Sequence, residues 1–480
     1  MPISSLKFGT SGLRGLSSEL DGPASAVYAA AFGWHLLNSG TAKSGDTILV
    51  ARDFRASSPS ISGICIGALQ RLGFSVCDCG PIPTPALAFY GMSRRVASLM
   101  VTGSHIPDDR NGIKFYLPDG EIGKSDELEI SSIAGQMLAA SDLPEAEWGQ
   151  GNEASREDEA LRLFAARNRA VLADVALKGL KVGVYQHSTV ARGLLVELLR
   201  DFDAEVIPLG FSDKFIPVDT EAVSAGTIEK LKAWTVEHQL DAIVSADGDG
   251  DRPLVADECG APLRGDLLGL LAAEFVGADA VVTPVTSNSG IEAALNCKVL
   301  RTKVGSPFVI AAMKEAAAAG AQRILGFEAN GGCLLGSDIT LNGKVLKALP
   351  TRDCFLPILA VLNKAAKSGL ALSKIAAFHK LPFALSDRLE DFPAETSAAL
   401  MSHLRASRAN LSAFLAPLGV PASVSDIDGL RVTLLDGGVI HLRPSGNAPE
   451  MRCYVEAASE TLAQALMKKG LGLISAWEMP

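Results

Sequence analysis

The chain has 480 residues, 48% of them hydrophobic and 20% charged, a balance typical of a globular protein with several buried cores. Its length predicts roughly three domains, with four also possible. The net charge of −10 and the lack of a basic stripe argue against nucleic acid as a partner. No apolar run reaches the roughly 18 residues of a membrane span, and the first residues lack a signal-peptide profile. We therefore expect a cytoplasmic protein with no membrane association.

The eight cysteines form no CxxC pair and no group with the spacing of a metal site. We therefore expect reduced thiols, most of them buried. Cys77 and Cys79 alternate along a predicted strand, where a disulfide between them would be strained.

Short β-branched runs alternate with longer Ala- and Leu-rich segments through the first three quarters of the chain. The predicted strands cover residues 47–51, 98–102, 182–185, 242–245 and 280–283. The predicted helices cover residues 24–37, 192–202, 228–238, 267–275 and 308–319. Such alternation indicates βαβ units with mixed, mainly parallel sheets, and the pattern occurs three times along the chain.

The last hundred residues follow a different pattern. Two predicted strands, 430–435 and 439–442, flank an Asp-Gly-Gly turn, which is a hairpin signal. A further strand at 451–455 and a helix at 462–476 predict an α+β unit. The sequence therefore predicts an α/β protein of three similar domains and a different fourth, divided at 1–150, 151–260, 261–370 and 371–480.

Three aspartates, Asp247, Asp249 and Asp251, alternate with glycines directly after a predicted buried strand. Carboxylates this close repel one another unless a cation lies between them, and the glycines allow a tight turn around one ion. Oxygen ligands favour Mg²⁺ or another hard divalent ion over zinc. A calcium loop with Glu258 at its twelfth position is the main alternative, although 252–256 resembles a strand rather than the helix that such a loop needs. The second alternative is a purely structural acidic turn.

Ser104 follows a predicted strand, at the sheet edge where parallel sheets expose nucleophiles. His105 and Lys114 lie nearby in the sequence and favour a functional serine over an ordinary turn hydroxyl. A serine hydrolase has little support, because a GxSxG motif is absent and no aspartate partner can be assigned.

Two further loops combine groups suited to a sugar phosphate. Arg443, Ser445, Gly446 and Asn447 place a guanidinium, a hydroxyl, an amide and a flexible backbone within five residues, which suits a phosphate. Glu328 and Asn330, in a separate glycine-rich loop, could hold vicinal hydroxyls. Neither loop excludes an ordinary polar turn. The glycine-rich start of the chain matches neither GxGxxG nor a P-loop, so nucleotide binding has little support.

In chain order these segments resemble the α-D-phosphohexomutase superfamily, and the resemblance covers essentially the whole sequence. The matching segments are the N-terminal signature at 8–15, the phosphoserine loop at 101–116, the metal loop at 247–252, the sugar loop at 326–332 and the phosphate loop at 443–449. Segments 52–58 and 80–85 are secondary matches.

The resemblance implies an enzyme with a central cleft lined by all four domains. Ser104 would carry a phosphate that coordinates one Mg²⁺ held by the three aspartates. Transfer to the sugar would give a hexose 1,6-bisphosphate, which reorients and returns its other phosphate to Ser104. Arg14 and Lys114 match proton-transfer positions, and Arg252 matches a contact to the transferred phosphoryl group.

The remaining matched residues would bind substrate. These are Lys303, Glu328, Asn330, Arg443, Ser445, Gly446 and Asn447. His105 adjoins the nucleophile and is grouped with the catalytic residues.

Departures from the common family pattern occur at Gly103, Ile106, Asn330 and 447–448. They resemble a bacterial subgroup of phosphomannomutases, which favours mannose over glucose and, less closely, glucosamine. No residue in the sugar loop by itself discriminates between hydroxyl epimers at C2. A dual-specificity mutase, a metal-dependent sugar phosphatase and a non-catalytic sugar-phosphate binder remain as alternatives. A monomer or a homodimer fits the family equally well.

Overall fold

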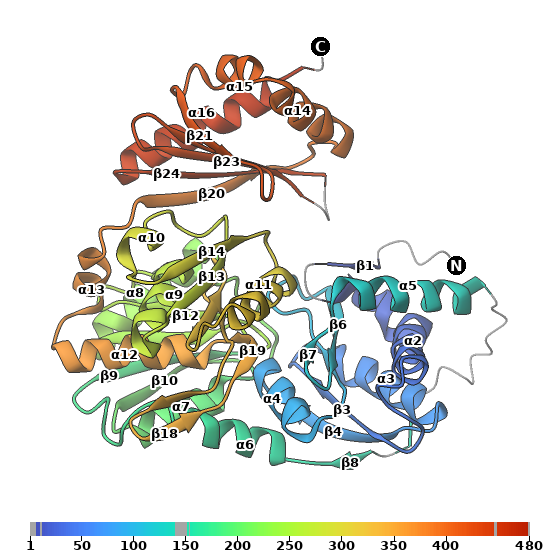
Figure 1. Ribbon diagram of the computed structural model, residues 1–480. Coiled ribbons are helices and arrows are strands. Elements are labelled where there is room, and N and C mark those ends of the chain that lie inside the picture. Colours follow the sequence, from blue (N-terminus) through green and yellow to red (C-terminus); the bar gives the residue numbers. More distant parts are fainter. Residues whose placement is uncertain (1–5, 10–11, 140–150, 153, 446–448, 479–480) are drawn as a thin grey trace.

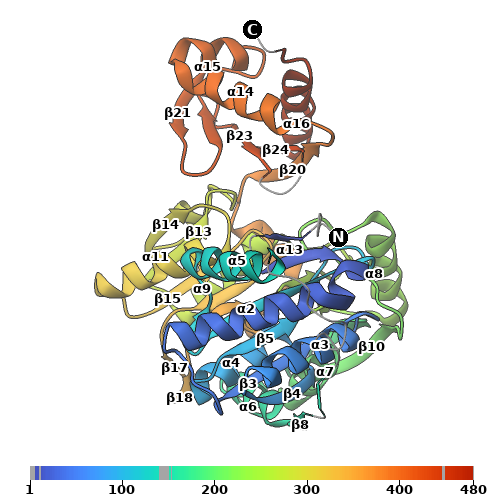
Figure 2. The same cartoon turned by 90° about the vertical axis from the view of Figure 1, so that its right-hand side faces the viewer.

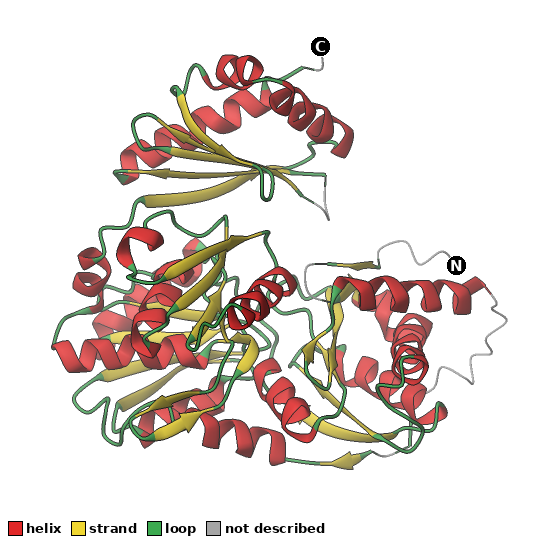
Figure 3. Cartoon of the chain, viewed as in Figure 1, coloured by secondary structure: helices red, strands yellow, loops and turns green. Residues whose placement is uncertain are grey.

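The computed structural model describes residues 6–9, 12–139, 151–152, 154–445 and 449–478. It confirms the predicted class of three α/β units followed by an α+β unit (Figure 3). The four domain limits proposed from the sequence stay a prediction, and the units below are defined by their sheets.

The first unit has an eight-stranded mixed sheet of order β1-β2-β6-β5-β3-β4-β8, with β7 paired to β6. Its strands are β1 (Lys7–Phe8), β2 (Leu13–Leu16), β3 (Thr47–Arg52), β4 (Ser75–Pro81), β5 (Ser98–Val101), β6 (Arg110–Leu117), β7 (Gly120–Glu121) and β8 (Ser155–Arg156). Its helices are α1 (Ser17–Glu19), η1 (Leu20–Ala24), α2 (Ser25–Asn38), α3 (Ser58–Arg71), α4 (Thr84–Arg94) and α5 (Lys124–Ala139). The parallel strands β5, β3 and β4 form its centre.

The second unit has a four-stranded sheet of order β10-β9-β11-β12, in which only β12 is antiparallel to its neighbour. Its strands are β9 (Lys181–His187), β10 (Glu205–Phe211), β11 (Ala242–Ala246) and β12 (Pro253–Ala256). Its helices are α6 (Glu159–Asn168), α7 (Arg192–Asp201) and α8 (Ala225–His238). All five residues of β11 are buried, as its continuous apolar run predicts for a central parallel strand. Residues 253–256 form a strand, whereas a calcium loop of this kind needs a helix there. This strand argues against the calcium-loop alternative.

The third unit has a five-stranded sheet of order β14-β13-β15-β16-β19, beside a hairpin of β17 and β18. Its strands are β13 (Ala280–Pro284), β14 (Lys298–Thr302), β15 (Ile324–Phe327), β16 (Cys333–Leu335), β17 (Ile339–Leu341), β18 (Lys344–Leu346) and β19 (Leu349–Asp353). Its helices are α9 (Gly265–Val276), α10 (Ile291–Ala294), α11 (Ser306–Ala318), α12 (Phe355–Ser368) and α13 (Leu372–Phe378).

The C-terminal unit has an antiparallel sheet of order β20-β24-β23-β22-β21. Its strands are β20 (Phe383–Leu389), β21 (Pro421–Ser425), β22 (Leu430–Leu434), β23 (Val439–Pro444) and β24 (Met451–Ala457). Its helices are α14 (Ala394–Ala406), α15 (Arg408–Leu415) and α16 (Glu460–Ser475). The predicted hairpin is therefore β22–β23, with Gly437 at a φ of 86° in its turn.

The apolar cores divide the molecule into a body and a separate C-terminal unit. One buried cluster runs through the first three units, and Phe164 of α6 packs edge-on against Phe355 of α12 within it, with ring centroids 5.2 Å apart. The C-terminal sheet has its own cluster with α14, α15 and α16. Figures 1 and 2 show this unit standing apart from the body and joined to it beside the third unit.

Within the described residues, all eight cysteines are free thiols and six of them are buried, as predicted. In the same residues, no single helix is long and apolar enough to cross a membrane. The bent pair α12 and α13 passes that test on length and composition alone.

The loop after β5, which carries Ser104, is held in place by Arg55 from the end of β3. Arg55 is 1% exposed, and its guanidinium donates to four carbonyl oxygens of this loop. The acceptors are Pro107 at 2.7 Å, Arg110 at 2.9 Å, Ser104 at 3.1 Å and Ile106 at 2.6 Å. These four hydrogen bonds, called the Arg55 brace below, stabilise an unusual backbone conformation. Ser104 has a φ of 56°, which non-glycine residues rarely adopt.

Asp53 and Gly103 complete the brace. The Asp53 carboxylate pairs with Arg55 Nε at 3.2 Å and accepts the Thr102 hydroxyl at 2.8 Å. A Cβ atom at Gly103 would lie 2.6 Å from the Arg55 guanidinium, so a larger residue there would displace the guanidinium from its present position. The Gly103 departure from the family pattern therefore has a structural reason.

We predict that Arg55→Lys will loosen residues 103–110, because a lysine cannot reach four diverging carbonyls and Asp53 at once. Loss of charged hydrogen bonds worth about 1.5–3 kcal/mol should speed amide hydrogen exchange there by roughly 10- to 100-fold. Arg110→Lys, an exposed change in the same loop, is the matched control. Unchanged exchange in the Arg55 variant would contradict the brace.

Candidate active site

Three buried aspartates lie together in the loop between β11 and β12. One carboxylate oxygen of each of Asp247, Asp249 and Asp251 lies within 4.8 Å of the others. Gly250 makes the tight turn possible with a φ of 70°. The loop also folds on its own side chains, because Asp247 Oδ1 accepts the backbone N–H groups of Asp251 and Arg252, each at 3.1 Å.

Cationic side chains from other parts of the chain neutralise this cluster. Lys114 of β6 donates to Asp249 Oδ2 at 2.6 Å and to Asp251 Oδ2 at 2.7 Å. Arg252 lies 3.7 Å from Asp251, and Arg352 of β19 donates to Asp251 at 3.1 Å. Side chains from three units therefore meet at the aspartates.

The surroundings shift the pKa values of Asp247 and Asp251 in opposite directions. Burial, together with repulsion from Asp249 and Asp251, raises the pKa of Asp247 well above its usual value. Burial also acts to raise the pKa of Asp251, but Arg352 and Lys114 outweigh it and hold that pKa far below the usual range. Asp247 therefore needs further positive charge more than Asp251 does.

The residues present fit a divalent metal ion. Asp249 Oδ1 and Asp251 Oδ1 are buried oxygens without a hydrogen-bond partner among the described residues. Buried carboxylate oxygens rarely remain unpaired unless an ion or water satisfies them. The donor set consists entirely of hard oxygens, which suits Mg²⁺ or a similar ion.

Ser104 lies directly beside the aspartates. Its hydroxyl donates to Asp247 Oδ2 at 2.5 Å and lies 3.3 Å from Nδ1 of His105. Thr84, at the start of α4, donates to Asp249 Oδ2 at 2.5 Å and so links the first unit to the aspartate loop. The structure thus brings together the serine and aspartate loops, which are more than 140 residues apart in sequence.

Burial and the surrounding cations lower the pKa values of Arg14 and His105. Arg14 lies on β2 opposite Gly112 of β6, and burial, with further repulsion from Arg252 and Arg352, lowers its pKa to about 10. Burial lowers the pKa of His105 well below its usual value, and the nearby arginines add to that shift. His105 is therefore neutral at pH 7. Because the single Ser104 hydroxyl hydrogen is donated to Asp247, a His105 tautomer with its hydrogen on Nδ1 would donate to Ser104 Oγ.

The sugar loop adjoins this centre through Arg352. Glu328 Oε2 accepts from Arg352 Nη1 at 2.9 Å, so this loop and the aspartate cluster share one guanidinium. The side-chain oxygen of Asn330 accepts the Gly332 N–H at 3.0 Å and therefore shapes the loop itself. Sequence reasoning missed Arg352, because a single arginine before a helix carries no motif.

The remaining predicted residues lie further from the aspartates. Lys303 is exposed after β14, with its ammonium 5.9 Å from the ring centroid of Phe308. Arg443 is at the end of β23, and its Nε donates to Asp428 at 2.9 Å. The same Asp428 oxygen accepts the Val304 N–H at 2.9 Å, which links the C-terminal unit to the Lys303 loop. Gly446 and Asn447 lie outside the described residues.

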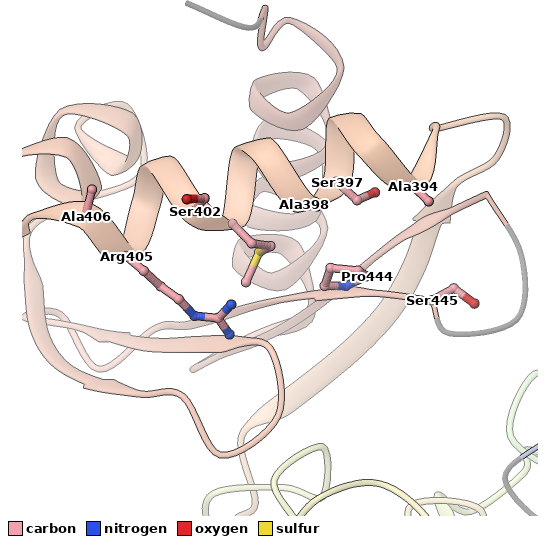
Figure 4. A pocket seen from close by; sticks show the side chains of 9 residues that line it. Ala394, Ser397, Ala398, Ser402, Arg405, Ala406, Pro444 and Ser445 are labelled. Carbon is pink, nitrogen blue, oxygen red and sulfur yellow. The ribbon is translucent and has the colours of Figure 1, made fainter.

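Ser445 lines a pocket of about 660 Å³ in the C-terminal unit (Figure 4). Arg405 and Ser402 of α14 line the same pocket. Ser445 also donates its N–H to the Glu450 carbonyl at 3.0 Å, which holds these two backbone positions together. This pocket lies within one unit and shares no residue with the aspartate cluster.

Four domain models of one family match the chain in order. They are the phosphoglucomutase/phosphomannomutase alpha/beta/alpha domains I, II and III, at residues 5–139, 164–260 and 264–381, and the C-terminal domain at residues 394–469.

Full-length relatives and a solved structure agree with these matches. The chain is 54% identical to a phosphomannomutase of Sinorhizobium fredii over 469 residues, covering 98% of both chains. It is 43% identical to a phosphomannomutase of Salmonella muenchen over 465 residues, covering 95% of this chain and 93% of the relative. A phosphoglucomutase/phosphomannomutase family protein of Burkholderia thailandensis shares the fold, with a TM-score of 0.73, 23% identity and 97% of each chain covered. The chain therefore belongs to the phosphoglucomutase/phosphomannomutase family.

Proposed function

We propose that this protein is a phosphomannomutase that interconverts mannose 1-phosphate and mannose 6-phosphate through a phosphate carried by Ser104. The observation that carries the proposal is the Ser104 hydroxyl, 2.5 Å from Asp247 in a buried aspartate cluster. Two full-length relatives named phosphomannomutase, at 54% and 43% identity, support mannose as the sugar.

The reaction has two balanced phosphoryl transfers. In the first, the P–O bond to Ser104 Oγ breaks as a sugar hydroxyl attacks the phosphorus and gives up its proton, which yields a hexose 1,6-bisphosphate. The bisphosphate then turns end for end in the cleft. In the second transfer, the Ser104 Oγ attacks the other phosphate, and the freed sugar oxygen regains a proton. The same bisphosphate, supplied externally, would load an unphosphorylated Ser104.

A Mg²⁺ ion bound by Asp247, Asp249 and Asp251 would neutralise charge on the phosphoryl oxygens. The chain supplies the remaining groups. Arg252, whose Nε lies 3.7 Å from Asp251, would contact the transferred group. Arg14 and Lys114 are the candidates for proton transfer, and His105 Nδ1 lies 3.3 Å from Ser104 Oγ.

The sugar and its second phosphate would be held by the other two units. Glu328 and Asn330 would bind sugar hydroxyls, and Lys303 lies on a neighbouring loop. Arg443 and Ser445, together with Gly446 and Asn447, would bind the phosphate that is not being transferred. A substrate bridging both groups would hold the C-terminal unit against the body and limit water access.

Ser104→Ala should abolish phosphate uptake by the protein, because Ser104 carries the hydroxyl that hydrogen-bonds to Asp247 within the described residues. We expect labelling from phosphate-labelled glucose 1,6-bisphosphate to disappear and mutase turnover to fall by about 10³-fold or more. Ser93→Ala, an exposed hydroxyl on α4, is the control. A labelled Ser104→Ala protein would show that another residue is the nucleophile.

Asp249→Asn should weaken metal binding at least about tenfold, since one anionic ligand becomes neutral. Calorimetric titration with Mn²⁺ measures this directly. Asp257→Asn is a matched control, because Asp257 belongs to the same unit but accepts backbone N–H groups of a turn. Equal Mn²⁺ affinity in wild type and Asp249→Asn would exclude Asp249 as a ligand.

Sugar preference is measured by kcat/KM on the 1-phosphates of mannose, glucose and glucosamine. We expect mannose 1-phosphate to give the highest value, with glucose 1-phosphate second because the two sugars differ at one hydroxyl. A higher value for glucose would make the protein a phosphoglucomutase. Steady release of inorganic phosphate without isomerisation would make it a phosphatase.

A further inference from the structure

Arg352 connects the aspartate cluster with the sugar loop. It lies on β19 and is 3% exposed. Its Nε donates to Asp251 Oδ2 at 3.1 Å, and its Nη1 donates to Glu328 Oε2 at 2.9 Å. One rigid guanidinium therefore holds two carboxylates that come from different units of the molecule.

The surrounding backbone is built to admit this side chain. In the sheet, Cys333 of β16 pairs with Asp353 of β19, which brings Arg352 alongside the end of the sugar loop. A Cβ atom at Gly332 would lie 2.9 Å from Arg352 Cγ and Cδ, and 3.0 Å from the Asp251 carbonyl oxygen. Only glycine at 332 leaves room for Arg352 to pass between the two loops.

The electrostatic setting favours a permanently charged bridge. Burial opposes the charge on Arg352, but Asp251 and Glu328 outweigh it and raise its pKa well above the usual value. A lysine would keep the charge but could not point donors at both carboxylates in one plane. The bridge therefore depends on the shape of the guanidinium as well as on its charge.

We propose that Arg352 is a positioning residue that links Glu328 to Asp251 of the proposed metal loop. This link orients the Glu328 carboxylate that binds the sugar. With Oε2 engaged by Arg352, Glu328 presents Oε1 to a sugar hydroxyl. The inference rests on the proposed function, in which Glu328 binds the substrate. It predicts that Arg352 and Glu328 contribute to sugar binding as one unit.

A double-mutant cycle tests this coupling. The dissociation constant of mannose 6-phosphate is measured by calorimetry for wild type, Arg352→Lys, Glu328→Gln and the double variant. We expect each single change to weaken binding about tenfold, in the range seen when residues supporting a ligand-binding group are removed. The double variant should also lose about tenfold, whereas independent residues would lose roughly a hundredfold. An additive cycle overturns the proposal.

Arg167→Lys is the matched control for general disruption. Arg167 is also buried and donates to Asp353, the residue after Arg352, at 3.1 Å. Its change should leave the dissociation constant within about twofold, because Asp353 forms no hydrogen bond or ion pair with Glu328 among the described residues. An equal loss in Arg167→Lys would show that any buried ion pair near β19 matters, and would overturn the specific role of Arg352.

Gly332→Ala provides a second route if Arg352→Lys does not fold. The added methyl group should displace the Arg352 side chain without changing any charge, and weaken mannose 6-phosphate binding about tenfold. Unchanged binding in this variant overturns the proposal. A wild-type protein that neither binds mannose 6-phosphate nor isomerises mannose 1-phosphate would defeat the proposed function itself. An active wild type with an additive cycle would defeat only the inference.

Discussion

Mutual repulsion among three buried carboxylates is the constraint on which the centre of this molecule depends. Asp247, Asp249 and Asp251 follow a fully buried strand, so water cannot screen them, and positive charge must come from the protein or from a bound ion. Lys114 and Arg352 supply part of that charge from two other units. Docking these units is therefore an electrostatic necessity as well as a consequence of apolar packing.

The same constraint explains why the units are not interchangeable modules. The shared core fixes the first three units relative to one another, and within that frame β6, the aspartate loop and β19 meet at one point. Removing Lys114 would leave the buried Asp249 carboxylate without the cationic partner described above, and breaking a buried ion pair in this way typically costs about 3–5 kcal/mol. Stability and chemistry thus draw on the same side chains here.

The C-terminal unit is attached in a different way. It has a separate core, and several hydrogen bonds join it to the third unit. Asp428 accepts from Val304, Glu456 accepts the Ser289 N–H at 3.1 Å, and Arg264 donates to the Ala384 carbonyl at 2.9 Å. Polar contacts between domains resemble those of transient interfaces, so this unit can move while the body stays intact. Asp428 also accepts a hydrogen bond from Arg443. A movement of the C-terminal unit would therefore also affect the proposed phosphate loop.

The sequence alone determined the elements and the local motifs. Predicted strands and helices match β3, β5, β9, β11, β13 and α2, α7, α8, α9, α11 to within a few residues, because hydrophobic periodicity and glycine turns are local properties. The grouping of Asp247 with Asp249 and Asp251 was equally local. Tertiary structure decided which distant groups meet them. The bridge from Arg352 to Asp251 spans 101 positions, and the link from Asp428 to Val304 spans 124. Such pairs leave no periodic or spacing signal, since they arise only when separate sheets pack together.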